Sequence, residues 1–403
     1  MTRSRATSTN TITVPGFKFA GVACGIKKSK KKDLALIFSE RPATAAALFT
    51  TNKVKAAPVL VGVRRMRRGF IQAVVVNSGN ANACTGARGV RDAEAMCREA
   101  ANRLQIAPGL ILPSSTGLIG VPLPMEKIKD GIRKAARILS VDSFAAAADA
   151  ILTTDRFVKI ASRTCRLNGK RAVVAGMVKG AGMIAPHMAT MLAYIFTDAA
   201  VGRDCLRAIL KRSADQTFHC ITVDGDMSTN DTVLFLANGA CGNSPVRRGS
   251  REEKALSKAS QAVMKDLALK LVEDGEGGTK VVQVLVEGAR SVAQAKRVAF
   301  TVANSKLVKT AFFGSDPNFG RIMAAIGYAG VPIRPERIDV AFNGVTVVKR
   351  GVGMASREKK AARVLSRPSF RLKIHLHQGE DSASVWTSDL SHEYVRINSA
   401  YKT

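Results

Sequence analysis

The pattern of hydrophobic and polar residues changes its period several times along the chain, which predicts a mixture of helices and strands. Residues 91–104 and 125–139 place apolar side chains at the spacing of an amphipathic helix. Strand-like runs occur at 73–76, 171–174, 281–286 and 338–342. The two kinds of segment alternate, which predicts an α/β fold made of helix and sheet layers with substantial antiparallel pairing.

Two local signals place the ends of elements. Ser250 and Glu253 form a capping box, in which the serine hydroxyl caps a helix and the glutamate returns to the serine's backbone. That helix is expected to run to about Val272, where a glycine-rich stretch stops it. Asn343-Gly344 lies between two alternating runs and predicts a type I′ hairpin.

The composition is that of a globular protein. The chain has 403 residues, of which 46% are hydrophobic and 23% charged, so it can bury a sizeable core. Its length predicts two or three domains. No apolar stretch approaches the roughly 20 residues that a membrane-spanning helix needs, so we expect no membrane insertion.

A formal net charge of +31 raises the question of nucleic-acid binding. Dense basic runs at 27–32 and 64–68 resemble segments that bind phosphate backbones. Aromatic residues make up only 5% of the chain, and no helix-turn-helix, zinc-finger or RNA-recognition pattern is present. The charge is also spread along the whole sequence. We therefore expect no specific nucleic-acid binding, and keep a basic nucleic-acid-associated protein as the non-enzyme alternative.

The candidate metal ligands do not show the spacing of a metal site. The seven cysteines form no CxxC pair and are widely scattered, which fits thiols in a reducing compartment. His375 and His377 share one face of an alternating run, but basic residues flank them and no third ligand is near. Asp224, Asp226 and Asp231 lack the ligand repeat and final glutamate of a calcium loop, which favours a hydrogen-bonded turn. The sequence predicts no bound metal.

A threonine between a glycine- and proline-rich loop and an apolar run is the first candidate for chemistry. Thr190 follows Ala189 and precedes the apolar residues 191–196. Cleavage of the Ala189–Thr190 bond would make Thr190 an N-terminal residue, whose α-amine could activate its own hydroxyl. A free α-amine has a reference pKa of about 7.7–8.0, near working pH. From these residues alone, a threonine that merely opens a buried strand is the simpler interpretation.

A second candidate is Thr116-Gly117, within the small-residue stretch 112–120. This stretch is predicted to be a loop between the helices at 91–104 and 125–139. The threonine hydroxyl and the unobstructed glycine N–H could act as an oxyanion hole in acyl transfer. Taken alone, an ordinary structural turn is the simpler interpretation.

Residues 179–199, KGAGMIAPHMATMLAYIFTDA, resemble the signature of the bifunctional glutamate/ornithine N-acetyltransferases of the cyclic arginine pathway. Further matching segments stand in order at 17–27, 74–86, 112–120, 151–155, 217–239, 272–280, 307–330 and 392–403. The resemblance covers the chain from about Val14 to Thr403. It implies an αββα-type sandwich core with a smaller C-terminal α/β domain that begins at about residue 280.

The resemblance also implies self-cleavage at Ala189–Thr190. The products would be an alpha chain, 1–189, and a beta chain, 190–403, which associate as an α2β2 heterotetramer. Thr190 would be the nucleophile, with Thr116 and Gly117 as the oxyanion hole. The implied substrate contacts are Thr153 or Thr154, Lys179, Thr190, Glu276, Asn398 and Thr403.

The substrate contacts have a chemical rationale. The ammonium of Lys179 suits a substrate carboxylate. The carboxylate of Glu276 suits either the δ-ammonium of an ornithine-like substrate or a role in positioning the nucleophile. Thr153 and Thr154 are neighbours in sequence, and adjacent strand residues face opposite ways, so which of them faces the substrate stays open.

The activity that the resemblance implies is transfer of acetyl from N-acetylornithine to glutamate through an acetyl-Thr190 intermediate. No cofactor is implied. Whether acetyl-CoA is a second acyl donor stays open, because no nucleotide-binding motif is visible. The alternative enzyme class is a self-cleaving amidase or aminopeptidase on a related scaffold, in which water accepts the acyl group.

Some positions depart from the family pattern. The departures are His187, His219, Cys220, Met227 and Phe319. Of these, His187 lies in the expected cleavage loop, and Phe319 lacks the indole donor of the usual tryptophan.

The N-terminal segment bears on the cellular compartment. The match begins near Val14, so a leader of about a dozen residues would be short for a transit peptide, and we expect a cytoplasmic protein.

Overall fold

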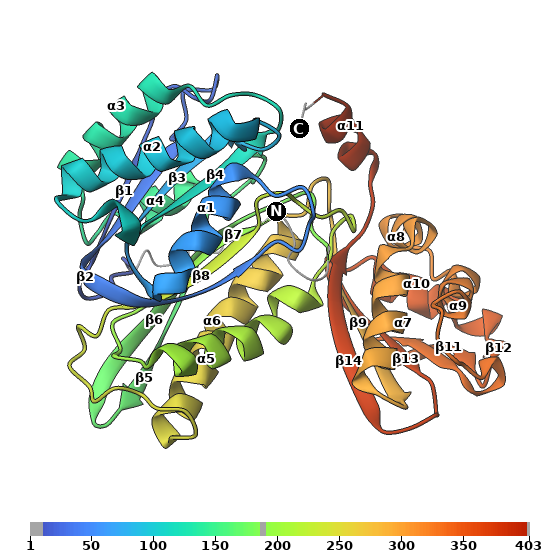
Figure 1. The fold of residues 1–403 in the computed structure, drawn as a ribbon. Coiled ribbons are helices and arrows are strands. Elements are labelled where there is room, and N and C mark those ends of the chain that lie inside the picture. Colours follow the sequence, from blue (N-terminus) through green and yellow to red (C-terminus); the bar gives the residue numbers. More distant parts are fainter. Residues whose placement is uncertain (1–10, 186–190, 401–403) are drawn as a thin grey trace.

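The computed structural model describes residues 11–185 and 191–400, which form a layered core and a smaller C-terminal domain (Figure 1). The core contains one continuous sheet with the strand order β4-β3-β2-β8-β7-β6-β5, and β1 pairs with β2 outside this path. The strands are β1 (Phe17–Val22), β2 (Leu34–Phe49), β3 (Phe70–Asn80), β4 (Ile111–Leu118), β5 (Lys159–Leu167), β6 (Lys170–Lys179), β7 (Leu192–Thr197) and β8 (Thr232–Ala237).

The long strand β2 divides this sheet into two layers. Its first part pairs with β3, its last part pairs with β8, and the β3 register breaks between Phe38 and Ala43. Apolar side chains from both parts of the sheet form one buried cluster. Within this cluster the rings of Phe19 in β1 and Phe196 in β7 meet edge to face, 5.3 Å apart. The two parts of the sheet therefore face each other across a shared core.

Helices cover the two outer faces of this double sheet (Figure 1). Helices α2 and α3 pack on the β1–β4 layer, and α5 and α6 pack on the β5–β8 layer. The helices of the core are α1 (Ala57–Arg65), α2 (Gly86–Leu104), α3 (Met125–Arg137), α4 (Phe144–Ala150), α5 (Arg203–Asp215) and α6 (Arg251–Glu273). The layers run helix, sheet, sheet, helix, which confirms the predicted αββα sandwich.

The predicted loop at 112–120 is wrong, because most of it lies in strand β4. This strand pairs in parallel with β3, in a register that sets Ser115 opposite Asn77 and Gly117 opposite Gly79. Ser114, Ser115 and Thr116 are all buried. Small polar residues here reflect tight packing inside the sandwich, and a periodicity argument cannot distinguish such packing from a loop.

The predicted capping box is confirmed at its serine and differs at its glutamate. The N–H of Glu253 donates to the Ser250 hydroxyl at 3.0 Å, and α6 begins at Arg251. The Glu253 carboxylate accepts from the N–H of Gly249, one residue earlier than expected, and also from the guanidinium of Arg212 at 2.6 Å. The arginine comes from α5. This tertiary contact explains why the Glu253 carboxylate does not bond to the backbone of Ser250.

A second sheet begins at Val281, close to the predicted start of a C-terminal domain. Its strand order is β12-β11-β10-β13-β9-β14. The strands are β9 (Val281–Ala289), β10 (Asp339–Phe342), β11 (Val345–Lys349), β12 (Val352–Gly353), β13 (Ser369–His375) and β14 (Asp381–Ser388). Helices α7 (Val292–Asn304), α8 (Lys306–Phe313), α9 (Phe319–Gly327) and α10 (Glu358–Leu365) share one apolar core with this sheet.

The hairpin between β10 and β11 is confirmed. Its central residues, Asn343 and Gly344, have φ values of 43° and 87°, as a type I′ turn requires. Nearby, the rings of His375 and His377 lie 3.8 Å apart, and Nε2 of His377 is 3.0 Å from a carboxylate oxygen of Asp339. No group of three metal-binding side chains occurs among residues 11–185 and 191–400.

The chain ends in α11 (His392–Ala400), which returns from the C-terminal domain to the core (Figure 1). Its Asn398 amide donates to the Glu276 carboxylate at 2.9 Å. Glu276 lies in the loop between α6 and β9. The last described helix therefore contacts the core at the loop between α6 and β9. No helix in the described ranges is long and apolar enough to cross a membrane.

Candidate active site

Three strands bring described residues from both sides of the predicted cleavage site to one edge of the sandwich. In the sheet register Lys179, the last residue of β6, pairs with Leu192, the first residue of β7. Leu192 in turn pairs with Thr232, the first residue of β8. Ala189 and Thr190 lie outside the described residues, as does His187. The described residue that directly follows Thr190 is Met191, which is buried at this edge.

Two carboxylates hold the backbone on either side of that segment. The oxygens of Asp224 accept from the N–H groups of Met183 at 2.6 Å and Ile184 at 2.8 Å. One oxygen of Asp231 accepts from the N–H of Met191 at 3.1 Å. Burial raises the pKa of Asp224 to about 6 and raises the pKa of Asp231 well above its usual value. The turn expected from the sequence is present at Asp224, which also accepts from the N–H of Asp226 at 3.2 Å. The other contacts tie both carboxylates to backbone about 40 residues earlier in the chain.

The predicted oxyanion pair lies at the end of β4. Gly117 has a φ of 132°, and a Cβ at this position would lie 2.3 Å from the carbonyl carbon of Gly79. Only glycine fits such an approach between two strands. Thr116 beside it is 5% exposed. Thr116 is therefore buried and Gly117 half-buried, with the glycine held close against the neighbouring strand, as a fixed donor for a developing negative charge needs to be.

Asn230 connects the oxyanion candidates to the edge that carries the cleavage segment. Its amide donates to the carbonyl of Ser115 at 2.8 Å and to the carbonyl of Ala81 at 2.7 Å. Asn230 directly precedes Asp231, which holds the backbone of Met191. The sequence interpretation missed the role of both residues, because their contacts are distant in sequence. The signal available was their place within the matching segment 217–239.

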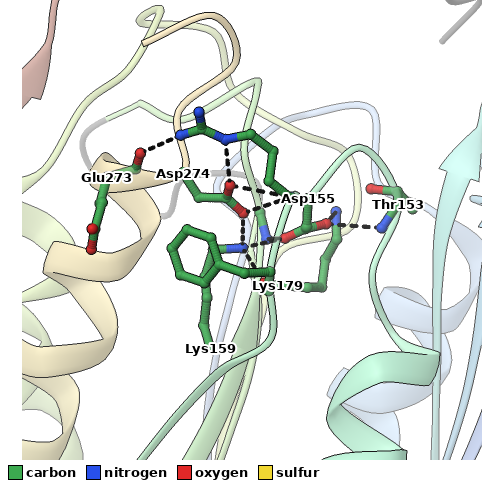
Figure 2. Close-up of polar contacts among 9 residues, drawn as sticks. Thr153, Asp155, Lys159, Lys179, Glu273 and Asp274 are labelled. Atoms are coloured by element: carbon green, nitrogen blue, oxygen red, sulfur yellow. Dashed lines mark hydrogen bonds and ion pairs between the residues drawn. The ribbon is translucent and has the colours of Figure 1, made fainter. Parts of the chain in front are cut away.

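Lys179 belongs to a buried network of charges (Figure 2). The ammonium of Lys159 lies 2.7 Å from Asp155 and also forms an ion pair with Asp274, and all three side chains are fully buried. The ammonium of Lys179 is 3.9 Å from the second oxygen of Asp155. Burial opposes ionisation of Asp155, but the two lysines outweigh it and hold the pKa of its carboxyl below the usual value. Lys159 and Asp274 are further residues that the sequence analysis did not identify.

The position of Lys179 suits an anion-binding group. Burial lowers the pKa of its ammonium, while the nearby carboxylates of Asp155, Glu276 and Asp231 act in the opposite direction. Its distance of 3.9 Å from Asp155 exceeds that of a direct hydrogen bond. A further carboxylate, such as that of a substrate, would therefore find a buried, charged donor at the end of β6.

The remaining predicted contact residues gather around the same edge. The N–H of Glu276 donates to the carbonyl of Ala181 at 2.9 Å, which ties the Glu276 loop to the segment after Lys179. The N–H of Thr153 donates to Asp155 at 2.8 Å (Figure 2), and both Thr153 and Thr154 are half-buried. The structure does not select one of these threonines. Thr403 lies outside the described residues.

The described departures from the family pattern occupy three different places. Phe319 is in α9, with its ring against Gly353 in the C-terminal domain. His219 lies 3.0 Å from the Asp215 carboxylate. Cys220 is buried, which raises the pKa of its thiol. Met227 belongs to the loop before β8, where its carbonyl accepts from the Asn52 amide at 3.2 Å.

Removing one buried charge should test whether the network supports the fold. Asp274→Asn should lower the free energy of unfolding by about 3 kcal/mol or more, because Lys159 then stays buried with one carboxylate instead of two. Asp266→Asn is the matched control, since Asp266 pairs with Arg163 at the surface and its loss should cost at most about 1 kcal/mol. Urea denaturation measures both changes, and equal losses would contradict this role.

Together, these observations define the class of protein: an αββα sandwich with a candidate acyl-transfer site at one edge of its double sheet. Comparison with known proteins narrows the class to one family. The ArgJ family model matches residues 18–403. The chain is 49% identical over 391 residues to the arginine biosynthesis bifunctional protein ArgJ of Geobacter sulfurreducens, covering 97% of this chain and 100% of the relative. The chain therefore belongs to the ArgJ family.

Two further relatives agree with this assignment. The ArgJ protein of Symbiobacterium thermophilum is 47% identical over 395 residues, which cover 97% of this chain and 98% of the relative. A crystal structure of the arginine biosynthesis bifunctional protein ArgJ from Bacillus halodurans is 37% identical in sequence and superposes with a TM-score of 0.50. The match covers 52% of this chain and 98% of the solved chain.

Proposed function

We propose that this protein is a self-processing N-acetyltransferase of arginine biosynthesis, which moves acetyl from N2-acetyl-L-ornithine to L-glutamate through an ester on Thr190. The observation that carries the proposal is the arrangement at the sandwich edge. There, Asp224 and Asp231 hold both flanks of the segment that contains Thr190, beside Lys179. The family assignment supports the pathway, since the curated relatives are named as arginine biosynthesis proteins.

The first reaction is cleavage of the chain. The Thr190 hydroxyl oxygen attacks the carbonyl carbon of Ala189, and the bond from that carbon to the Thr190 nitrogen breaks as the nitrogen takes up the hydroxyl proton. The resulting ester is hydrolysed by water, which leaves a carboxylate on Ala189 and a free α-amine on Thr190. The solved Bacillus halodurans chain supports two products, since it matches almost completely while covering only about half of this chain.

The second reaction is acetyl transfer in two steps. The Thr190 hydroxyl attacks the acetyl carbonyl of N-acetylornithine, its proton passes to the α-amine, and ornithine leaves after that proton reaches its nitrogen. The amine of glutamate then attacks the acetyl ester and restores the Thr190 hydroxyl. In each step negative charge develops on the acetyl oxygen, and Thr116 with the N–H of Gly117 is the donor pair in this proposal.

The charged side chains at this edge of the sandwich suit the charged groups of both amino-acid substrates. Lys179 is the proposed partner of a substrate carboxylate, because its ammonium is buried and not hydrogen-bonded to Asp155. Glu276 is the proposed partner of the ornithine δ-ammonium. Asn398 fixes the Glu276 carboxylate through a 2.9 Å hydrogen bond from α11. Thr153 or Thr154 and Thr403 complete the proposed contacts.

A glutamate-dependence assay should separate transfer from hydrolysis. Ornithine release from N-acetylornithine should depend on glutamate and yield N-acetylglutamate in equal amount, because the glutamate amine is the acyl acceptor. Amino-acid analysis of the mixture measures both products. Release at the same rate without glutamate would instead identify an amidase, and no release would leave a binding role such as nucleic-acid association.

A second assay, with acetyl-CoA in place of N-acetylornithine, tests whether the protein has another acyl donor. The relatives are named bifunctional, and we propose that acetyl-CoA is a second acyl donor to glutamate. Formation of N-acetylglutamate from acetyl-CoA and glutamate alone would support this, and its absence would restrict the protein to N-acetylornithine. We also propose that the reaction needs no bound cofactor, that the two products of cleavage assemble as an α2β2 heterotetramer, and that the protein acts in the cytoplasm.

A further inference from the structure

We propose that the lysine-rich loop between β1 and β2, residues 23–33, binds the phosphate groups of acetyl-CoA beside the candidate active site. The inference rests on the part of the proposed function in which acetyl-CoA is a second acyl donor. It deepens that part, because it assigns a binding site to phosphates, which N-acetylornithine and glutamate lack. The lysines of the loop are Lys27, Lys28, Lys30, Lys31 and Lys32.

The loop lies at the same end of the sheet as the oxyanion candidates. The hairpin of β1 and β2 closes with Leu34 paired to Val22. Leu34 also pairs with Asn77 of β3, just before Gly79. Gly79 in turn lies opposite Gly117, the glycine of the oxyanion pair. The loop therefore leaves the sheet beside the residues that are proposed to bind the acetyl oxygen.

Lys27 brings the start of the basic run into contact with β3. A Cβ at Gly79 would lie 3.2 Å from Cγ of Lys27. Burial lowers the pKa of the Lys27 ammonium to about 8, while nearby carboxylates, among them Asp155, oppose this shift and the cation of Lys179 adds to it. Asp155 and Lys179 belong to the charge network of the candidate site, so the basic run begins at that site.

The backbone of the loop is held in place by its own side chains. The buried carboxylate of Asp33 accepts from the successive N–H groups of residues 24–27 at 2.7–3.1 Å. The ammonium of Lys27 donates to the carbonyl of Lys32 at 2.6 Å, which closes the loop. A loop that is already ordered loses less conformational freedom when it binds a ligand.

Most of the positive charge on the loop is available to a ligand. Lys28, Lys30 and Lys31 are exposed, and none of them forms an ion pair with a described residue. Lys32 lies 3.4 Å from the carboxylate of Asp149, and both side chains are partly exposed. Ammonium groups are common partners of phosphate in proteins. Several of them on one fixed loop suit a ligand that carries more than one phosphate.

The other basic run of the chain differs in its pairing and its position. Within residues 64–68, both Arg64 and Arg65 pair with Glu94. This run precedes Phe70, the first residue of β3, whereas Gly79 lies near the last. The two basic runs therefore lie at opposite ends of β3. The run at 64–68 provides a control for positive charge that is remote from the candidate site.

The length of acetyl-CoA agrees with this placement. Its pantetheine arm, which joins the thioester to the diphosphate, is about as long as four extended residues, roughly 14 Å. Lys31 is four residues beyond Lys27 and can lie at most about 14 Å from it. With the thioester carbonyl at Gly117, the arm can therefore reach the exposed lysines of the loop.

The first test compares two thioesters that differ in their phosphates. The loop variant, Lys28→Gln with Lys31→Gln, removes two exposed charges. Its KM for acetyl-CoA at saturating glutamate should rise about 5-fold or more. Its KM for acetylpantetheine, which has the same thioester without the phosphates, should equal that of the parent protein. The rate of N-acetylglutamate formation, followed by mass spectrometry, gives both constants.

The matched control variant is Arg67→Gln with Arg68→Gln. It removes the same number of exposed charges from the distant basic run. Neither KM should change in this variant, because its net charge falls equally but the charges lie far from the site. An equal rise in the KM for acetyl-CoA in both variants would show non-specific attraction and overturn the inference.

A second readout does not depend on acetyl transfer. Isothermal titration should show that CoA binds the parent protein and the control variant equally, and binds the loop variant about 5-fold more weakly or less tightly still. A double-stranded DNA oligonucleotide is titrated alongside, because its phosphates carry the same charge. A loop variant that loses affinity for DNA and keeps its affinity for CoA would identify a nucleic-acid site and overturn the inference.

The outcomes separate this inference from the proposed function. An unchanged KM for acetyl-CoA in the loop variant would overturn the inference. A parent protein that transfers acetyl from N-acetylornithine but does not bind CoA would also overturn it and leave the main reaction standing. A parent protein that binds CoA through the loop, yet forms no N-acetylglutamate from acetyl-CoA, would leave the binding site standing and reject the second acyl donor.

Discussion

Replacing Thr190 with alanine should abolish both chain cleavage and acetyl transfer. One hydroxyl is proposed as the nucleophile in both reactions, so its removal leaves neither reaction a group that can attack a carbonyl. Purified Thr190→Ala should therefore run as one chain of full length, with transfer reduced to background. Intact-mass measurement and the glutamate-dependent assay give the two results on the same sample.

Thr190→Ser is the control for this change. Serine keeps the hydroxyl and, after cleavage, the α-amine, and loses only a methyl group. This variant should cleave and keep measurable transfer. Substantial turnover by the alanine variant would mean that another residue is the nucleophile.

Thr116→Ala should lower kcat by about 100-fold, if its hydroxyl donates to the oxygen that becomes negative in the transition state. The donation is made mainly in the transition state, so the KM for N-acetylornithine should change little. Steady-state kinetics of the cleaved protein measure both constants. Cleavage itself attacks a different carbonyl, so its rate should be followed separately.

Ser115→Ala distinguishes chemistry from packing at this strand. The Ser115 hydroxyl donates to the side chain of Asn77 at 2.6 Å within the sheet, next to Thr116 in sequence. Its loss should cost about 1 kcal/mol of stability and leave kcat close to that of the parent protein. A Thr116→Ala protein that is destabilised to a similar extent but fully active would reject the oxyanion role.

The parts of the fold that the sequence predicts are those set by local chemistry. Ser250 caps α6 because a hydroxyl at that position satisfies an N–H three residues later, and Asn343-Gly344 forms a hairpin because both residues tolerate positive φ. The local sequence of strand β4 predicts a loop, and that prediction is wrong. Its small polar residues are explained only by the second layer of the sandwich, which the local sequence does not contain.

The same distinction between local sequence signals and long-range contacts applies to the candidate site. Thr116, Lys179, Glu276 and Asn398 could be proposed because they lie in segments that match the family, and the structure brings the last three around one loop. Asn230 contacts residues 115 and 149 positions away, which no local pattern indicates. Lys159 is fully buried between two carboxylates, one of them more than 100 residues away in sequence, and the local sequence contains no sign of this. Such residues become visible only when the long-range contacts are known.

The central claim is that Thr190 carries the acetyl group after the chain has cleaved before it. The most direct test is mass spectrometry of the purified protein after brief incubation with N-acetylornithine in the absence of glutamate. We predict two chains, of which the one that begins Thr-Met-Leu-Ala gains a single acetyl group on Thr190 and loses it when glutamate is added. An active protein that stays as one chain, or an acetyl group that is transferred from another residue, would contradict the claim.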